Sequence, residues 1–241
     1  MQLFLIRHGE SENNVLYRQN GGTTGRVPEP RLTELGRHQA NLLAAHVARP
    51  FTLPDELNMN GYGLTHLYCS LMVRAVQTAT AVAQATKLPL HVWEIVHEGG
   101  GIFEHDEKTG TYTGLSGENR NFYETHFPHL ILPETVGEDG WWNRPYETRP
   151  EMMARVEIFL DELHARHGRT EDKVAVVSHG GFINGILRTI FGVYDGDEAV
   201  NWSIWYKINN TAITRIDFND GNVSLAYHNR TCHLSAAQLS Y

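Results

Sequence analysis

Residues 3 to 11 read Leu3-Phe4-Leu5-Ile6-Arg7-His8-Gly9-Glu10-Ser11, and this stretch decides the fold. Its four leading apolar residues predict a buried strand that ends at Arg7 and His8. A charged pair at the end of a buried strand must be paired or solvated. A neutral imidazole can attack phosphorus, and a guanidinium can hold two phosphoryl oxygens. Gly9 is expected to let the backbone approach a ligand closely. The alternative is a histidine that is only hydrogen-bonded at a strand end.

The same arrangement recurs twice further along the chain. Val174 to Val177 predicts a second buried strand, and Ser178-His179-Gly180-Gly181 follows it directly. A strand predicted at 65–69 is followed by a segment that carries Arg74. Because ligands bind at the carboxyl ends of parallel strands, two histidines and two arginines are expected to converge there. Such a cationic pocket can stabilise the equatorial oxygens of a phosphoryl group in transfer.

Strands alternate with helices over most of the sequence. The predicted strands are 3–6, 65–69, 90–96, 173–177, 211–218 and 223–227. The predicted helices are 34–49, which begins after a Thr33 cap and ends at Pro50, 73–86, 150–167 and 181–191. Residues 20–30 are predicted as a loop, and residues 219–222 as a hairpin turn. This order predicts a three-layer α/β/α fold with a mostly parallel central sheet. We expect one domain over 1–241, with 98–149 as an inserted lid because Gly, Pro, Asn and aromatic residues break the pattern there.

Composition limits the partners that the chain can have. The 241 residues carry a formal net charge of −8, with 41% hydrophobic and 20% charged residues. This balance is typical of a globular protein and disfavours nonspecific binding to nucleic acid or to an anionic membrane surface. The two cysteines make no disulfide framework, and no apolar run is long enough to span a bilayer. We expect a cytoplasmic protein with a small anionic ligand.

An ordered set of motifs resembles one enzyme family. The set comprises Arg7 to Ser11, Leu32-Thr33-Glu34-Leu35-Gly36 with Gln39-Ala40, Ser70 to Ala79, Ser178 to Gly181, and Asn210 to Arg215. Together these motifs resemble branch 1 of the histidine phosphatase superfamily, the phosphoglycerate mutase-like enzymes. The resemblance covers nearly the whole chain and is weakest in 98–149.

The resemblance implies roles for individual residues. His8 would be the nucleophile that becomes phosphohistidine, while Arg7, Arg74 and His179 would bind the phosphoryl group. Asn14 matches a family position at the rim of the pocket. An acidic residue would protonate the leaving oxygen and then activate water. The resemblance implies no metal and no cofactor, since arginine and histidine neutralise the phosphoryl charge, and it implies a small phosphorylated substrate.

The acidic residue is sought in the stretch from His97 to Glu104. Glu98 fits the family position as the acid, and Glu104 is the second candidate because the spacing is one residue short of the commonest pattern. Such a proton donor needs burial to raise its pKa. The alternative is that both are surface carboxylates on a glycine-rich loop.

The insert also offers candidate substrate-binding residues. Its aromatic residues, Trp141 and Trp142 among them, either form a small core for the lid or line a pocket for the leaving group. Arg120 and Arg144 either bind a second anionic group of the substrate or lie on the surface.

Three other kinds of site fit the sequence less well. Cys69 and Arg74 are spaced one residue too closely for a cysteine-phosphatase loop, so Cys69 is expected to be buried. His105-Asp106 matches the dipeptide of metal-dependent hydrolases, but those enzymes need a helical fold. The remaining histidines, such as His46, His164 and His167, have no zinc-like spacing and are expected at the core edge or surface.

Within the family, the fate of the phosphoryl group sets the activity. The 98–149 segment does not resemble the cofactor-dependent phosphoglycerate mutase segment, which favours a phosphatase. The alternatives are mutase-type phosphoryl transfer and an inactive phosphoryl-binding module. Both histidines, both arginines and a candidate acid are present, which favours an active enzyme.

Overall fold

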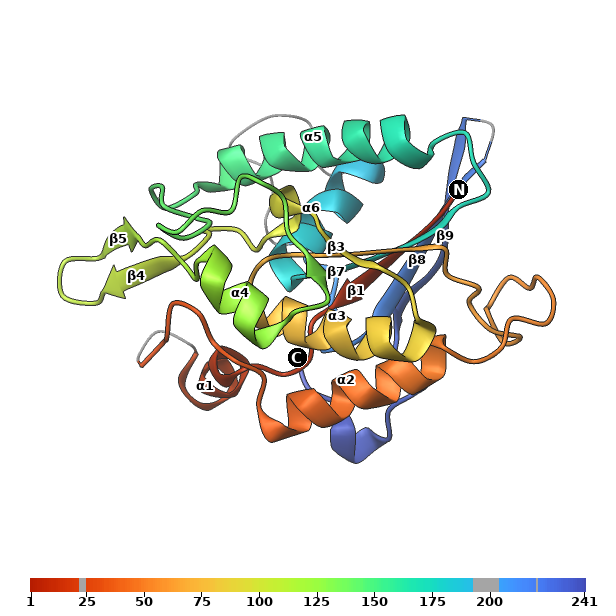
Figure 1. Ribbon diagram of the computed structural model, residues 1–241, viewed down its shortest axis with the longest axis horizontal. Helices are drawn as coiled ribbons and strands as arrows, with labels where there is room; N and C mark the ends of the chain where they lie inside the picture. The colour runs from red at the N-terminus through yellow and green to blue at the C-terminus, as the bar shows by residue number, and fades with distance from the viewer. Residues whose placement is uncertain (22–24, 193–203, 220) are drawn as a thin grey trace.

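The computed structural model describes residues 1–21, 25–192, 204–219 and 221–241. Within these residues, seven strands form one sheet in the order β6-β3-β2-β7-β1-β8-β9 (Figure 1). The strands are β1 (Gln2–Arg7), β2 (His66–Cys69), β3 (Leu90–Val92), β6 (Leu130–Ile131), β7 (Lys173–Ser178), β8 (Ile213–Asn219) and β9 (Asn222–Arg230). The first five in spatial order are parallel, and β8 and β9 join antiparallel at one edge. The predicted mostly parallel sheet is confirmed.

Helices cover both faces of the sheet. Figure 1 shows α2 (Glu34–Val47) and α3 (Val73–Thr86) below it, and α5 (Arg149–His167) and α6 (Gly180–Ile190) above it. The predicted three-layer α/β/α architecture is therefore confirmed. In the described part of the chain, no helix is both long and apolar enough to cross a membrane.

The apolar run in β1 supplies both hydrophobic cores. Phe4 and Ile6 belong to the cluster under α2 and α3, whereas Leu3 and Leu5 belong to the cluster under α5 and α6. All four are fully buried. Successive side chains of a strand point to opposite faces, so a strand covered on both sides must be apolar at every position.

Local signals set the helix boundaries. Thr33 caps α2, and its side chain accepts a hydrogen bond from Gly36 N at 3.0 Å. Thr148 and Glu151 form a capping box at the start of α5, with Pro150 in the first turn. Sequence signals of this kind predicted both helices to within a residue or two.

Two elements differ from the prediction. The strand predicted at 90–96 ends at Val92, and a short 3₁₀ helix, η1, follows over Glu94–Val96. The helix α1 (Glu12–Asn20) was not predicted, because none of its residues is buried and it therefore has no apolar stripe. Residues 22–24 of the predicted loop and Asp220 of the predicted hairpin turn lie outside the described residues.

The 98–149 segment contributes helices and strands of its own to the fold. It holds a separate hairpin, β4 (Phe103–Asp106) with β5 (Thr111–Gly114), and then α4 (Arg120–His126). It also supplies β6, which pairs with β3 at the edge of the central sheet. Tyr123, Val136, Trp141 and Trp142 join the core under α2 and α3. The segment thus shares the main core instead of forming a separate small one, and a single domain over 1–241 stays a prediction.

Candidate active site

Three strands of the sheet end at the same place. In the register of the sheet, Arg7 of β1 lies beside Ser178 of β7, and Cys69 of β2 lies beside Val177. The residues that follow these strand ends, His8, His179 and Ser70, are therefore brought together. The rings of His8 and His179 lie 5.1 Å apart between centroids.

His8 is held as a neutral imidazole. Its Nδ1 lies 2.7 Å from the carbonyl oxygen of Gly9, which can only accept, so Nδ1 carries the proton. The lone pair of Nε2 remains and accepts a hydrogen bond from Arg74 Nε at 3.2 Å. Burial, with the positive charges of Arg74 and Arg7, holds the pKa of His8 well below its usual value. A neutral ring with its proton on Nδ1 and its lone pair on Nε2 is the form that can act as a nucleophile.

Arg74 lies in the first turn of α3 and is buried. Its Nη2 donates to the sulfur of Met72 at 3.1 Å, and its Nη1 lies 3.9 Å from Glu29 Oε1. Burial raises the pKa of Glu29 to about 7, against the opposing effect of Arg74. Burial also lowers the pKa of Arg74 itself. The positive charge beside His8 is thus only loosely countered by protein carboxylates.

Arg7 leaves one donor unused. Its Nη1 donates to Ile208 O at 2.6 Å, whereas its buried Nε has no hydrogen-bond partner among the described residues. Burial lowers the pKa of Arg7 to about 10, which keeps the guanidinium charged at neutral pH. A buried donor without a partner is costly unless a ligand satisfies it.

His179, whose ring lies next to that of His8, also has a buried nitrogen without a partner among the described residues. Its Nε2 lies 2.9 Å from Ser70 Oγ, which also accepts from Met72 N at 3.1 Å. The buried Nδ1 of His179 has no partner among the described residues. Burial and the charge of Arg74 hold the pKa of His179 well below its usual value.

Glu98 lies at the N-terminus of α6. Its Oε1 accepts from Gly99 N and Phe182 N, and its Oε2 accepts from Gly181 N, each at 3.0 Å. A helix N-terminus offers unpaired N–H groups and a favourable dipole to a carboxylate. Glu98 therefore points toward the strand ends that hold His8 and His179.

Two other predicted residues have structural contacts. Asn14 Oδ1 accepts from Ser11 N at 3.0 Å and from Asn210 Nδ2 at 3.1 Å, at the edge of the site. Gly9 packs against the start of α2, and its role in the close approach of a ligand stays a prediction. A Cβ there would lie 2.5 Å from Gly36 O, so α2 packs against the backbone at this point.

The site opens into a cavity of about 770 Å³. Arg7, His8, Asn14, Arg74 and Glu98 line it. Tyr146, one of the aromatic residues of the 98–149 segment that were candidates for a pocket, also lines it. The sequence did not reveal the other residues of its wall, which include Tyr17, Arg26, Trp205, Lys207 and Tyr241. These residues come from loops, α1 and the C-terminus, where no strand end or periodicity marks them.

The remaining predicted pocket residues lie elsewhere. Glu104 is exposed on β4 and lines a separate hollow with His105 and Asp106, so Glu98 is the carboxylate that reaches the site. Trp141 and Trp142 are buried in the core under α2 and α3.

The two arginines of the insert also have other contacts. Arg120 donates to Val136 O at 2.9 Å and to Pro133 O at 2.6 Å. Arg144 lies 4.0 Å above the Trp142 ring. Neither is among the residues that line this cavity, and their role in binding a second anion stays a prediction.

The structure also shows where the residues of the alternative candidate sites lie. Cys69 is fully buried, which raises the pKa of its thiol and removes it as a nucleophile. His105 and Asp106 lie in the β4–β5 hairpin, not in a helical metal site. Among the described residues, His66, His167 and Asp172 form a group with metal-ligand spacing, away from the strand ends described above.

Comparisons with known proteins agree with this geometry. The profile of the histidine phosphatase superfamily (branch 1) matches residues 3–231. The chain is 28% identical to phosphoserine phosphatase 1 of Hydrogenobacter thermophilus, over 97% of this chain and 94% of that protein. It is 26% identical to a 2,3-bisphosphoglycerate-dependent phosphoglycerate mutase of Leifsonia xyli, over 82% of this chain and 80% of that protein.

The fold is similar to solved structures of the same kind. A phosphoserine phosphatase mutant of Entamoeba histolytica, in complex with phosphoserine, matches with a TM-score of 0.58 and 21% identity, over 97% of this chain and 99% of that chain. A mycobacterial glucosyl-3-phosphoglycerate phosphatase matches with a TM-score of 0.59 and 19% identity, over 95% of this chain and 99% of that chain. With its sequence profile and its fold both matched over nearly their full length, the chain belongs to branch 1 of the histidine phosphatase superfamily.

Proposed function

We propose that this protein hydrolyses a phosphomonoester through a phosphohistidine at His8 Nε2. One observation carries the proposal: the neutral His8 keeps its lone pair on Nε2, and two side chains of the same site each have a buried nitrogen without a partner among the described residues. These nitrogens are Arg7 Nε and His179 Nδ1. A phosphoryl group placed against His8 satisfies both donors and receives charge from Arg74.

The first step transfers the phosphoryl group to the enzyme. His8 Nε2 forms a bond to phosphorus while the bond from phosphorus to the leaving oxygen breaks. Glu98, in its protonated form, gives its proton to that oxygen, which leaves as an alcohol. Ser70 Oγ accepts from Met72 N, and in the tautomer that we propose the Ser70 hydroxyl donates to His179 Nε2. His179 Nδ1 then carries a proton and donates it in a hydrogen bond to a phosphoryl oxygen.

The second step releases phosphate. Water attacks phosphorus, the bond from His8 Nε2 to phosphorus breaks, and Glu98 takes the proton of the water. Arg7 and Arg74 supply the positive charge that a metal supplies in other phosphoryl-transfer enzymes, and His179 supplies a neutral donor, so we propose a metal-independent reaction. For each proton transfer, Glu98 must release one of its backbone hydrogen bonds at the start of α6.

Hydrolysis is favoured over mutase-type transfer by the cavity wall. Tyr17, Trp205 and Tyr241 line the cavity and are 59%, 54% and 46% exposed. Water therefore has access to the phosphohistidine, whereas a mutase must exclude water and return the group to the bound skeleton. The 28% identical relative that matches 97% of this chain is a phosphatase, which supports the same choice.

We further propose a small phosphorylated carboxylic acid as the substrate. Arg26 and Lys207 line the cavity but are not among the residues that contact His8. A second anionic group, such as a carboxylate, can pair with these cations while its phosphate lies at His8. Related structures contain phosphoserine and 3-phosphoglyceric acid, which have this chemistry.

The test is phosphate release from phosphoserine and 3-phosphoglycerate by the full chain, with a chelator present. Phosphoethanolamine is the control substrate, because it lacks only the carboxylate of phosphoserine. We expect turnover that the chelator does not reduce and that His8→Ala lowers by at least about 1,000-fold. Acid-sensitive labelled phosphate on the wild-type chain, absent from His8→Ala, would identify the intermediate.

Other outcomes would change the assignment. Equal turnover by wild type and His8→Ala contradicts the role of His8. Transfer between phosphoglycerates without net phosphate release indicates a mutase. Phosphate binding without turnover of any substrate indicates an inactive binding module.

The substrate class has its own prediction. Lys207→Ala and Arg26→Ala should each raise KM for phosphoserine by roughly 10-fold, the loss of one exposed charge-assisted contact. KM for phosphoethanolamine should change little. Equal changes for both substrates would contradict a carboxylate contact while leaving the phosphohistidine mechanism untouched.

A further inference from the structure

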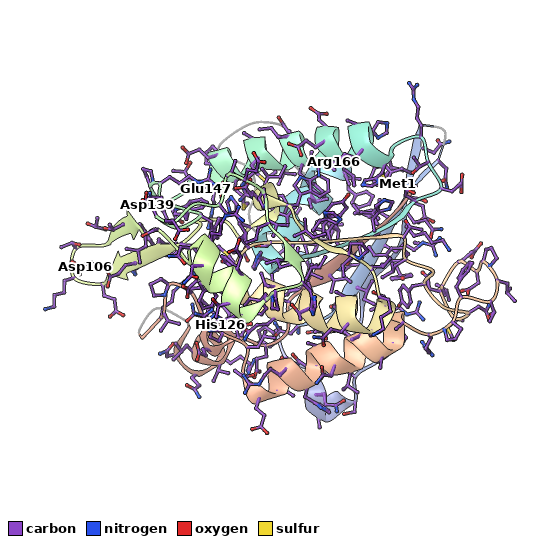
Figure 2. The ribbon with its side chains drawn as sticks, viewed as in Figure 1. Met1, Asp106, His126, Asp139, Glu147 and Arg166 are labelled. Carbon is purple, nitrogen blue, oxygen red and sulfur yellow. The ribbon has the colours of Figure 1, made fainter. Side chains whose placement is uncertain are left out.

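A second group of ionisable side chains lies at the end of the strands that is opposite to the active site. His66 is the first residue of β2, His167 is the last residue of α5, and Asp172 directly precedes β7. The active site lies where β2 and β7 end, so this group lies where they begin. Figure 2 labels Glu147 near the start of α5 and Arg166 near its end. Glu147 lines the active-site cavity, whereas Arg166 directly precedes His167 in the sequence.

The three side chains have the spacing of metal ligands. Their ligand atoms all lie within 4.8 Å of one another. His167 Nδ1 lies 2.8 Å from Asp172 Oδ2, and His66 Nδ1 lies 3.8 Å from Asp172 Oδ1. Ligand atoms around a tetrahedral Zn²⁺ are ~3.3 Å apart, given bonds of about 2.0–2.1 Å. Small side-chain rotations would bring all three onto one ion, which would replace the hydrogen bond of His66 Nδ1 with Thr65 Oγ1 at 2.9 Å and that of His167 Nδ1 with Asp172.

A tyrosine hydroxyl lies beside the buried histidine. His167 Nε2 lies 3.1 Å from the hydroxyl of Tyr68. Without a metal ion, His167 Nδ1–H donates to Asp172 Oδ2, because a carboxylate can only accept. When an ion binds, the ring proton lies on Nε2 and is donated to the Tyr68 oxygen, and Nδ1 presents its lone pair to the ion. The phenol thus does for His167 what carboxylates and carbonyls do for histidine ligands in metal sites.

Burial and charge suit a cation that enters from solvent. The side chain of His167 is 5% exposed, whereas those of Asp172 and His66 are 24% and 40% exposed. One side of the group is therefore open, which leaves an entry path and room for water as a further ligand. The neighbouring Arg166 pairs with Glu162 at 2.6 Å, so its charge is partly offset.

We propose that His66, His167 and Asp172 bind one divalent transition-metal ion of the Zn²⁺ type. Two imidazoles and a carboxylate favour such ions over Mg²⁺ or Ca²⁺, which prefer oxygen ligands only. The ion joins the end of α5 to the beginnings of β2 and β7. Its role is structural, and it is independent of the reaction at His8.

The test uses the full chain, freed of metal with a chelator and then dialysed. Titration with Zn²⁺ should show one equivalent bound, and thermal unfolding should shift upward by roughly 3 °C or more at saturation. Co²⁺, used as a spectroscopic probe, should give the visible absorption of a tetrahedral nitrogen and oxygen site. Adding the chelator should reverse both effects.

Three variants make the test specific. His66→Ala and Asp172→Asn alter partly exposed side chains and should weaken Zn²⁺ binding by at least about 10–100-fold. His164→Ala is the matched control, because it removes an exposed histidine from the same end of α5 and should leave binding unchanged. The Co²⁺ spectrum reports on the ligands directly, so loss of stability alone cannot imitate the result.

Some outcomes would overturn the proposal. These are no bound Zn²⁺ in the wild type, or an equal loss of binding in His164→Ala and His66→Ala. Turnover of phosphomonoesters is a separate readout, and it should be the same with and without Zn²⁺ at this group.

Discussion

At the scale of single residues, Gly181 controls the position of the proposed acid. A Cβ at Gly181 would lie 2.4 Å from Glu98 Oε1, whereas a Cβ at Gly180 would lie 3.5 Å from Arg7 Nε, an ordinary contact. Gly181→Ala should therefore displace the Glu98 carboxylate and lower kcat by about 10–100-fold, part of the usual contribution of a general acid. Gly180→Ala is the matched control and should cost much less.

The leaving group separates displacement of Glu98 from general damage. An aryl phosphate releases a stable phenolate and needs little help from an acid, whereas an alkyl phosphate depends on it. The loss of kcat in Gly181→Ala should therefore be larger for phosphoserine than for an aryl phosphate. An equal loss for both substrates would argue that the variant disturbs His8 or the arginines instead.

At the scale of elements, α4 of the insert is tied to the segment that carries Arg74. The buried Tyr123 of α4 donates its hydroxyl to Leu71 O at 2.5 Å, in the turn between β2 and α3. Tyr123→Phe should lower the free energy of unfolding by about 1–2 kcal/mol, the cost of a lost buried hydrogen bond. Urea unfolding measures it, with the exposed Tyr112→Phe as a control that should change little.

The same variant tests whether the insert shapes the site. If α4 holds the β2–α3 turn in place, Tyr123→Phe should also lower kcat several-fold, because small displacements of catalytic groups are costly. Unchanged kcat together with lowered stability would limit the role of α4 to packing.

Elements with a strong local signal could be predicted from the sequence. β1 is apolar at every buried position because helices cover both faces, and α2 and α5 carry their own caps. β6 has no such signal. It is a two-residue strand whose pairing with β3 is set by distant parts of the chain. α1 has no buried face, so periodicity could not reveal it.

The residues of the candidate site also differ in whether the sequence indicates them. His8, His179 and Glu98 follow strands or turns that the sequence marks. His8 and Glu98 line one cavity, and the ring of His179 lies 5.1 Å from that of His8. Arg26 and Lys207 lie in irregular segments, where only the folded chain shows which cations face the cavity. The three proposed zinc ligands come from separate elements, so no sequence spacing could indicate them.

At the scale of the whole molecule, buried histidines link stability to pH. Burial holds the pKa values of His8, His97 and His179 well below the usual range. It also lowers those of His46 and His233 to about 4. In the unfolded chain these rings take up protons near pH 6.5, whereas in the folded chain they remain neutral. As the pH falls below 6.5, the unfolded state therefore binds more protons and the protein loses stability.

The expected result is a falling free energy of unfolding between pH 7 and pH 5, measured in urea at several pH values. Each proton taken up only by the unfolded chain contributes about 1.4 kcal/mol per pH unit. Glu29 acts in the opposite direction, because burial raises its pKa to about 7 and protonation then favours the folded state. Five histidines outweigh one carboxyl, so the net slope should be positive with pH. His46→Gln should reduce that slope, since its ring is one of the five and lies away from the cavity. A stability that is flat or rises toward pH 5 would show that these rings become protonated without unfolding.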